Sequence, residues 1–307
     1  MADGKVLRLP SFVHVGPPRT GTTWLHEVLS GHIGLPSKKE TRFFDARYDR
    51  GAEWYCNLFG DYPADVPGGE MAPTCFSNAL ARERIKRHIP DCKIIVTFRE
   101  PAARLYSQYR LFRLERSHVH DTFDEYWRSR VYSAADLCGY ATQLKRWQAA
   151  FGESRVLVLF YDDLSSNPQG YLDTVCDFIG ARRIDLDRSR VGRGRVYAAP
   201  AAPRSNAIAK RAVATLHWIS SRGARPLIQL SQRAGLWKII RRPFVEDFPP
   251  LTDESADEIR AISLPETEEL ELITGRDLSG WKPAASMIEV GRDRMRPVPL
   301  PLRHGRG

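Results

Sequence analysis

Short apolar runs alternate with segments of helical periodicity through the first part of the chain. Unbroken apolar runs predict buried strands at residues 11–16, 93–98 and 155–160, and an extended piece near 33–37. Apolar residues three or four positions apart predict helices over 22–30, 76–88, 101–115, 122–130, 139–151 and 168–180. Because strands that alternate with helices pair in parallel, the pattern predicts an α/β fold of three layers, with a central parallel sheet flanked by helices.

The last third of the chain follows a different pattern. An acidic helical stretch covers residues 252–274, and a Pro/Arg-rich tail begins at about residue 282. Before them, the segment from Arg188 to Val245 holds thirteen Lys and Arg and no Asp or Glu, which exceeds the net charge of +9 of the whole chain. Apolar spacing around Trp218 and Trp237 predicts helices in this basic segment. We predict one domain over residues 1–281, with a basic helical region at about 188–245, and a separate tail over 282–307.

The first strand ends in a Gly/Pro turn that opens a helix at Thr22. The run is Phe12-Val-His-Val-Gly-Pro-Pro-Arg-Thr-Gly-Thr-Thr-Trp24. Free backbone N–H groups of a first helical turn and the positive end of the helix dipole attract an anion, and Gly21 permits its close approach to the backbone. The sequence therefore predicts a P-loop-like phosphate site at the turn that holds Arg19, Thr20, Gly21, Thr22, Thr23 and Trp24.

The spacing Gly16-x4-Gly21-Thr22-Thr23 is similar to the P-loop of nucleoside-triphosphate enzymes, with one difference in charge. That motif has Lys where this chain has Thr22, and here the basic residue is Arg19. Such enzymes also place an acidic residue at the end of a later strand to hold magnesium, whereas strand 93–98 is followed by Arg99. We therefore predict that the site binds phosphate through its own cations with no metal. A P-loop small-molecule kinase is the alternative, and a requirement for magnesium would distinguish it.

Several ordered segments resemble the sulfotransferases that use 3′-phosphoadenylyl sulfate (PAPS). The loop Pro18-Arg-Thr-Gly-Thr-Thr-Trp24 is similar to their 5′-phosphosulfate loop, and Phe98-Arg-Glu-Pro-Ala-Ala-Arg-Leu-Tyr-Ser107 is similar to their 3′-phosphate site. Lys39-Glu-Thr-Arg-Phe-Phe-Asp45 resembles the heparan-sulfate branch of the family, and Val156 to Leu164 resembles the family's later strand. Gly69-Glu-Met-Ala-Pro-Thr-Cys75 also resembles a family stretch, with Met71 where Lys is frequent. The resemblance covers roughly residues 10 to 180.

The resemblance implies a reaction and a role for each site residue. An acceptor hydroxyl would attack the sulfur of PAPS in line, and adenosine 3′,5′-bisphosphate would leave. Glu40 would act as the base, Arg19 would stabilise the leaving phosphate, and Lys39 would hold the sulfonate. Arg99 and Ser107 would bind the 3′-phosphate, Trp24 and Tyr161 would flank the adenine or ribose, and the basic region 188–245 would close over the cofactor. His14 is interpreted as a strand residue, not a catalytic one.

Composition predicts a soluble globular protein, and the resemblance implies an enzyme of the bacterial type, because the luminal relatives carry a membrane anchor and a C-terminal disulfide that are not evident in this sequence. The chain of 307 residues is 42% hydrophobic and 27% charged, as in ordinary globular proteins. No apolar run is long enough to span a bilayer, and the start Met-Ala-Asp-Gly-Lys lacks the apolar region of a signal peptide. No pair among the five cysteines has metal-ligand spacing, which predicts reduced thiols: Cys56, Cys75, Cys92, Cys138 and Cys176. We expect a cytoplasmic location.

The basic segment leaves a second class of function open. A non-enzymatic protein that binds nucleic acid or an acidic membrane would use such a segment through counterion release. That hypothesis leaves the Arg19 loop and the Arg99/Ser107 pair without a role, so we predict an enzyme with no nucleic-acid partner. The expected acceptor is a hydroxyl of a carbohydrate, a lipid or a secondary metabolite, and peripheral contact with an acidic membrane surface is compatible with the charge.

Overall fold

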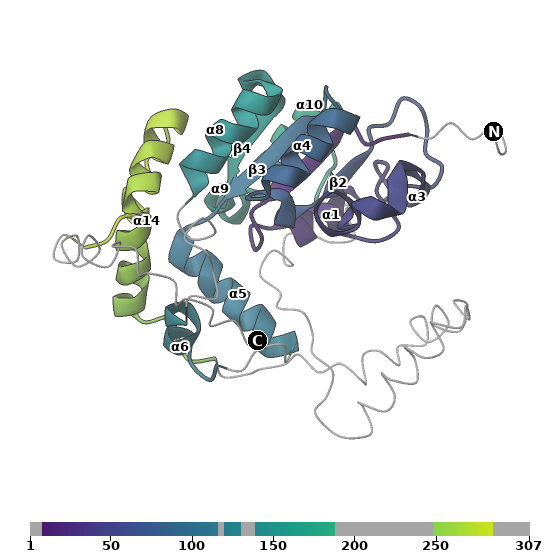
Figure 1. Ribbon diagram of the computed structural model, residues 1–307. Helices are drawn as coiled ribbons and strands as arrows, with labels where there is room; N and C mark the ends of the chain where they lie inside the picture. The colour runs from purple at the N-terminus through teal and green to yellow at the C-terminus, as the bar shows by residue number, and fades with distance from the viewer. Residues whose placement is uncertain (1–7, 116–119, 130–138, 188–247, 285–307) are drawn as a thin grey trace, which may run out of the picture.

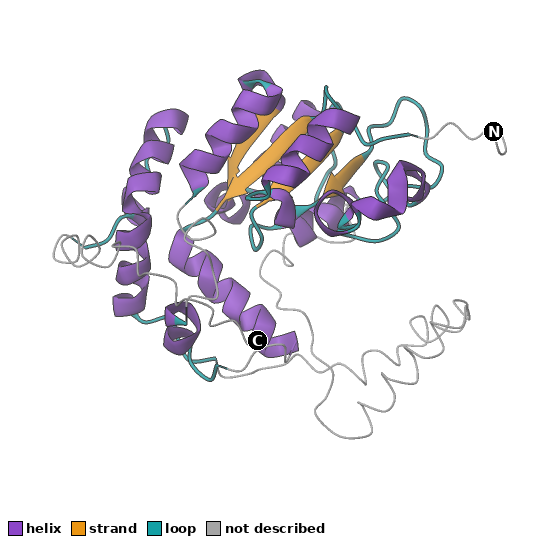
Figure 2. Cartoon of the chain, in the orientation of Figure 1, coloured by secondary structure: helices purple, strands orange, loops and turns teal. Residues whose placement is uncertain are grey.

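A parallel β-sheet forms the centre of the protein (Figure 2). The computed structural model describes residues 8–115, 120–129, 139–187 and 248–284. Within them, the strands are β1 (Phe12–Gly16), β2 (Gly69–Met71), β3 (Lys93–Phe98) and β4 (Val156–Phe160), in the order β2-β1-β3-β4. Each neighbouring pair is parallel. The predicted α/β fold with a central parallel sheet is confirmed.

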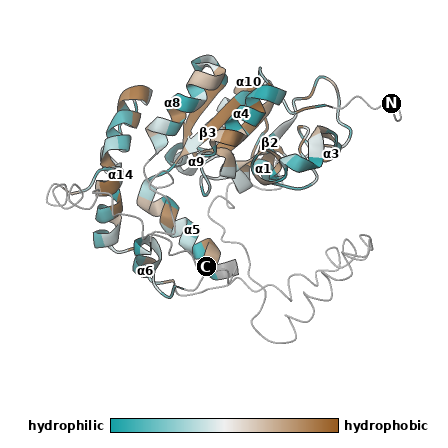
Figure 3. Ribbon diagram, in the orientation of Figure 1, coloured by the Kyte–Doolittle hydropathy of each residue, from teal (hydrophilic) through white to brown (hydrophobic). Residues whose placement is uncertain are grey.

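Helices cover both faces of the sheet and give the three predicted layers (Figure 1). Alternate residues of β1 point to opposite sides, since Val13 packs in the core cluster with α4 and α8 and Phe12 packs in the cluster with α1 and α10. Figure 3 shows that these helices carry both hydrophilic and hydrophobic residues. The helices are α1 (Thr22–Leu29), α2 (Phe43–Ala46), α3 (Gly51–Asn57), α4 (Ala79–His88), α5 (Pro101–Glu115), α6 (Phe123–Arg128), α8 (Tyr140–Phe151), α9 (Tyr161–Ser166), α10 (Pro168–Ile179) and α14 (Asp253–Thr274).

A third core cluster joins α5 and α6 to α14, which returns from far along the chain (Figure 1). Tyr109 of α5, Tyr126 of α6 and Ile259 of α14 are buried together in it. On the neighbouring α8, the Thr142 amide and hydroxyl donate to Glu266 at 2.8 and 2.5 Å. The acidic helix predicted at 252–274 is therefore present, and it attaches to the helix that follows β3.

The sequence predicted most elements closely but missed the short ones. Strand 93–98 and helix 101–115 agree with β3 and α5. The helix expected from residue 76 begins at Ala79, because the Asn78 side chain caps it by accepting from the Ala81 amide. The extended piece near 33–37 is wrong as a strand and makes only isolated bridges at Ile33 and Gly34. β2, α2, α3 and α9 were not predicted, since three to seven residues show little periodicity.

Several predictions fall outside the described residues. The basic region 188–245 with Trp218 and Trp237 lies outside them, as do Cys138 and the tail from residue 285. The division into a domain over 1–281 and a tail stays a prediction. Cys56, Cys75, Cys92 and Cys176 are buried free thiols. Among the described helices, none combines the length and apolarity that a bilayer crossing requires.

Candidate active site

The predicted phosphate loop lies between the end of β1 and the start of α1. Gly16 and Gly21 have φ values of 97° and 91°, which favour glycine. A Cβ at Gly21 would collide with the Leu164 side chain of α9, so the loop packs closely against that helix. Thr20 Oγ1 donates to the Pro17 carbonyl at 2.7 Å and closes the turn. This packing fixes the backbone that would surround an anion.

The amides at the start of α1 precede its hydrogen-bond ladder. Leu25 N donates to Gly21 O at 3.0 Å and makes the first bond of the helix. The amides of Thr22, Thr23 and Trp24 therefore have no acceptor within the ladder. Together with the positive end of the helix dipole, they form an arrangement that binds phosphate and sulfate oxygens.

Arg19, Arg99 and Ser107 meet beside this loop. Arg19 lies in the left-handed region, with a φ of 71°. Its Nε donates to Ser107 Oγ at 3.1 Å, and its carbonyl accepts from Arg99 Nη1 at 3.1 Å. The structure thus brings together a residue of the loop, a residue at the end of β3 and a residue of α5. Two guanidinium groups and a hydroxyl at one place can bind more than one anionic group.

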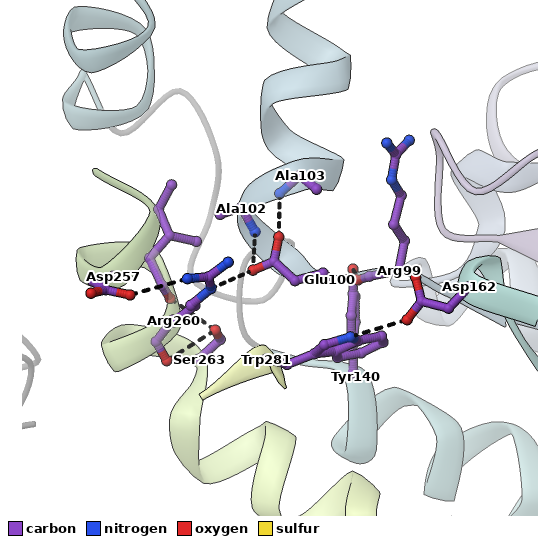
Figure 4. Close-up of polar contacts among 11 residues, drawn as sticks. Arg99, Glu100, Ala102, Ala103, Tyr140, Asp162, Asp257, Arg260, Ser263 and Trp281 are labelled. Carbon is purple, nitrogen blue, oxygen red and sulfur yellow. Dashed lines mark hydrogen bonds and ion pairs between the residues drawn. The ribbon is translucent and has the colours of Figure 1, made fainter. Parts of the chain in front are cut away.

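The Arg99 guanidinium is directed to the loop by its neighbours. It stacks on the Tyr161 ring, 4.1 Å from the ring centroid. Burial lowers the pKa of Arg99 from its ordinary value, and Tyr161, Tyr140 and Glu100 oppose that effect. The backbone carbonyl of Arg99 accepts from the Tyr140 hydroxyl at 3.0 Å. In Figure 4 the guanidinium of Arg99 points away from the ion pairs around Glu100, and it therefore remains directed to the loop side.

Glu100, the residue after Arg99, caps helix α5. Its carboxylate accepts from the Ala102 amide at 3.2 Å and from the Ala103 amide at 2.6 Å. Arg260 of α14 donates to the same carboxylate at 3.1 Å and also pairs with Asp257 (Figure 4). The cap fixes the direction in which α5 leaves β3, and so fixes where Ser107 stands relative to the loop.

Lys39 and Glu40 reach the start of α1 at Thr23. Lys39 Nζ donates to Thr23 Oγ1 at 2.7 Å and to Glu40 Oε1 at 2.8 Å. The two side chains are 28% and 32% exposed, so both are accessible from solvent. Lys39 thereby connects the candidate base to the phosphate loop.

Two predicted aromatic neighbours of the cofactor have different positions. Tyr161 lies under Arg99 and against Gly21, at the edge of the loop. Trp24 is only 4% exposed and packs edge-on against Tyr171, with ring centroids 6.2 Å apart. The indole of Trp24 is thus part of the core, and its predicted place beside the adenine or ribose stays a prediction. Its backbone amide still faces the loop, as the start of α1 requires.

His14 lies beneath the loop as a buried strand residue. Its Nδ1 accepts from the Gly16 amide at 3.2 Å, so Nε2 carries the proton and donates to Thr97 Oγ1 at 3.0 Å. Thr97 Oγ1 is in turn 2.7 Å from the Tyr171 hydroxyl. Burial lowers the pKa of His14 to about 4, with a smaller contribution from Lys39. A neutral His14 therefore supports the backbone of Gly16 where the loop begins.

The sequence did not indicate a role for Glu70, which is buried on β2. Its carboxylate contacts Thr41 and Tyr55, directly behind the Lys39–Glu40 turn. A single Glu in a short strand is usually a solvated surface residue, so its own pattern carries no signal. The resemblance of the segment from Gly69 to Cys75 to a family stretch is the only signal at this position, and it assigns Glu70 no role.

Among residues 8–115, 120–129, 139–187 and 248–284, no three His, Cys, Asp or Glu form a group suited to a metal ion.

Fold and site together define an α/β protein with a parallel sheet and with cations gathered at the carboxyl ends of its strands. The chain belongs to the sulfotransferase domain family, whose pattern matches residues 9–190. This match covers β1 to β4 and every candidate site residue named above.

Individual relatives agree with the family. The chain is 31% identical over 193 residues to human heparan sulfate glucosamine 3-O-sulfotransferase 3B1, which covers 59% of this chain and 48% of that protein. It is 28% identical over 199 residues to human bifunctional heparan sulfate N-deacetylase/N-sulfotransferase 2, which covers 56% of this chain and 22% of that protein. The chain thus spans half or less of the length of these relatives. A sulfotransferase from Alicyclobacillus acidocaldarius has a similar fold, with a TM-score of 0.60 at 20% identity over 89% of this chain and 99% of that one.

Proposed function

We propose that this protein transfers the sulfuryl group of PAPS to an acceptor hydroxyl and releases adenosine 3′,5′-bisphosphate. The observation that supports this most directly is the set of contacts around the start of α1. Lys39 bridges Thr23 and Glu40, and Arg19 of the same loop meets Ser107 and Arg99. A base and cations for two separate anionic groups therefore surround one loop.

The residues fit the charge and shape of such a donor. The amides of Thr22 to Trp24 and Arg19 would hold the 5′-phosphosulfate. Gly21 lets the loop pack against Leu164 of α9, which fixes the backbone that would surround the ligand. Arg99 and Ser107 would hold the 3′-phosphate. The partly buried guanidinium of Arg99 stacks on Tyr161 and so loses little further freedom on binding. Hydrogen-bond donors and cations predominate at these positions, as the sulfonate, the 5′-phosphate and the 3′-phosphate of PAPS require.

The reaction needs a base at the acceptor and a stabilised leaving group. Glu40 would take the hydroxyl proton as the new S–O bond forms. Lys39, 2.8 Å from Glu40, would offset the charge of that carboxylate beside an anionic donor and would hold the sulfonate. Arg19 and the α1 amides would stabilise the negative charge that develops on the phosphate oxygen when its bond to sulfur breaks.

We propose a cytoplasmic enzyme whose acceptor is a hydroxyl of a carbohydrate, a lipid or a secondary metabolite. The carbohydrate names of the sequence relatives support the first of these. The thirteen cations between Arg188 and Val245 support an anionic acceptor, or one presented at an acidic membrane surface. A P-loop kinase is less well supported, because β3 is followed by Arg99 where such enzymes hold magnesium with an acidic residue.

The base is tested by Glu40→Gln, which keeps the size of the side chain but cannot accept the proton. We expect sulfuryl transfer from PAPS, measured by mass spectrometry across an acceptor panel, to fall by on the order of 10²- to 10⁴-fold. Calorimetric binding of adenosine 3′,5′-bisphosphate should be nearly unchanged. The matched control is Glu53→Gln at an exposed position of α3, which should keep full activity.

Two outcomes would contradict this proposal. A wild-type chain that transfers nothing from PAPS but phosphorylates an acceptor with magnesium and ATP would be a kinase. If the Glu40→Gln variant transfers the sulfuryl group at a near-normal rate, another group takes the proton of the acceptor hydroxyl.

A further inference from the structure

A buried carboxylate lies directly behind the turn that carries Lys39 and Glu40. Glu70 on β2 is 1% exposed. Its Oε1 accepts from the Thr41 amide at 2.8 Å and from the Thr41 hydroxyl at 2.6 Å. Its Oε2 accepts from the Tyr55 hydroxyl at 2.6 Å. A buried carboxylate with three donors is satisfied in its ionised form, although burial itself raises the pKa of Glu70 and these hydrogen bonds oppose that rise.

The direction of each hydrogen bond is fixed. Thr41 Oγ1 accepts from the Phe43 amide at 3.1 Å, so the Thr41 hydroxyl proton is available for Glu70. Burial raises the pKa of Tyr55 well above its ordinary value, so the phenol keeps its proton and donates it. The Tyr55 ring stacks on Phe43, with centroids 4.5 Å apart and planes 11° apart. Thr41 is therefore held between the sheet and the first turn of α2.

The backbone on both sides of Thr41 is strained. Glu40 and Arg42 have φ values of 58° and 61°, in the left-handed region that residues other than glycine seldom adopt. Such a conformation is unfavourable and persists only where the surroundings of the residue determine it. The contacts of Thr41 with Glu70 and Phe43 supply that determination. In this conformation the Glu40 carboxylate accepts from Lys39, which also donates to Thr23.

We propose that Glu70, Thr41 and Tyr55 form a clamp that positions Glu40 for catalysis. This inference rests on the proposed function, since it assigns Glu70 and Thr41 as positioning residues for the same base. None of the three takes part in proton transfer. They hold the strained turn at residues 39–42 so that Glu40 and Lys39 stay aligned with the phosphate loop.

The clamp is tested by a pair of substitutions at one position. Thr41→Val keeps the branched shape and removes the hydroxyl that donates to Glu70 and accepts from Phe43, whereas Thr41→Ser keeps the hydroxyl. For Thr41→Val we expect kcat for sulfuryl transfer to fall about 10- to 100-fold, the effect of a misplaced catalytic group. The KM for PAPS and the Kd for adenosine 3′,5′-bisphosphate should stay within about two-fold. Thr41→Ser should retain near wild-type kcat.

A second variant and a second measurement make the test independent of folding and of activity. Tyr55→Phe keeps the ring on Phe43 and removes one donor from Glu70, so it should also lower kcat and leave bisphosphate binding intact. Hydrogen exchange at the Phe43 amide should accelerate about ten-fold or more in Thr41→Val and stay near the wild-type rate in Thr41→Ser.

The outcomes separate the clamp from the proposed function. An active wild-type chain whose Thr41→Val and Tyr55→Phe variants keep their kcat would overturn the clamp alone. Equal losses of kcat and bisphosphate affinity would also overturn it, because a merely destabilised structure would produce them. A wild-type chain that transfers nothing from PAPS would overturn the proposed function, and the exchange rates would still decide whether the network holds the 39–42 turn.

Discussion

Arg19 and Arg99 contribute different properties to the same site. Arg19 belongs to the loop itself and reaches Ser107 from a left-handed backbone. Arg99 follows β3 and is held by Tyr161, by the Arg19 carbonyl and through its own carbonyl by Tyr140. A guanidinium held in this way needs little reorganisation to bind a phosphate. If Arg99 contacts only the 3′-phosphate, it should contribute to the binding free energy only of ligands that carry this phosphate.

Arg99→Ala should therefore discriminate between two nucleotides. We expect the variant to bind adenosine 3′,5′-bisphosphate more weakly by about 1.5–3 kcal/mol, the range of charge-assisted hydrogen bonds. Binding of adenosine 5′-phosphate, which lacks the 3′-phosphate, should be almost unchanged. Calorimetry with both ligands measures the difference, and Arg99→Lys, which keeps the charge without the fork, should lie between. Equal losses for both ligands would remove Arg99 from the 3′-phosphate site.

At the residue scale, the sequence indicated groups with a local pattern and missed those whose position depends on distant segments. Arg19 and Arg99 could be found because a turn and a strand end are local features. The expected place of Trp24 beside the nucleotide stays a prediction, and its contact with Tyr171 of α10 was not indicated by the sequence. Glu70 was missed because its partners Thr41 and Tyr55 come from other elements, and only the folded sheet brings them to β2.

At the scale of elements, α5 follows the end of β3, carries Ser107 and is anchored by α14. Glu100 accepts from two amides of the first turn of α5 and from Arg260 of α14. The cap and the ion pair share one carboxylate. The sequence predicted both helices over almost their full length, yet it contained no indication that they are attached, because Glu100 and Arg260 are 160 positions apart.

Glu100→Ala should lower the free energy of unfolding by about 1–2 kcal/mol, since it removes a helix cap together with its ion pair. Arg260→Ala should lower it by less than about 1 kcal/mol, because the cap survives and Arg260 is partly exposed. Urea unfolding of both variants measures the two losses. Thr122→Ala removes the cap of α6 and serves as the control for the loss of a cap without an ion pair. Equal losses for the two variants would show that the ion pair, not the cap, dominates.

At the scale of the whole molecule, parallel pairing decides where the site forms. β1, β3 and β4 all direct their carboxyl ends to one edge of the sheet, which brings together the loop, Arg99 and Tyr161. The sequence predicted this edge from three strands and could not predict β2, which has three residues and pairs with β1 from a distant position. The same strand holds Glu70, so the missed element and the missed residue have one cause.

His14 connects the stability of the whole molecule to pH. Its pKa is lowered from 6.5 to about 4, chiefly because the ring is buried and secondarily because of Lys39. The unfolded chain binds a proton at His14 below pH 6.5, whereas the folded chain does not until about pH 4. Between these values the unfolded state holds more protons, so the free energy of unfolding falls as the pH falls. Above pH 6.5 the group is neutral in both states and contributes no pH dependence.

As the pH falls from 6.5 to about 4, the free energy of unfolding should fall by about 3 kcal/mol because of His14, at 1.36 kcal/mol per pH unit. His14→Asn removes the titrating ring, and its amide oxygen can still accept from the Gly16 amide. We expect the variant to be less stable than wild type at pH 7, since the contact with Thr97 is lost, but to have a flatter stability profile between pH 6.5 and 4.5. Urea unfolding at half-unit steps measures both curves. Parallel curves over this range would show that His14 does not cause the acid sensitivity and that other groups, such as the carboxylates, titrate there instead.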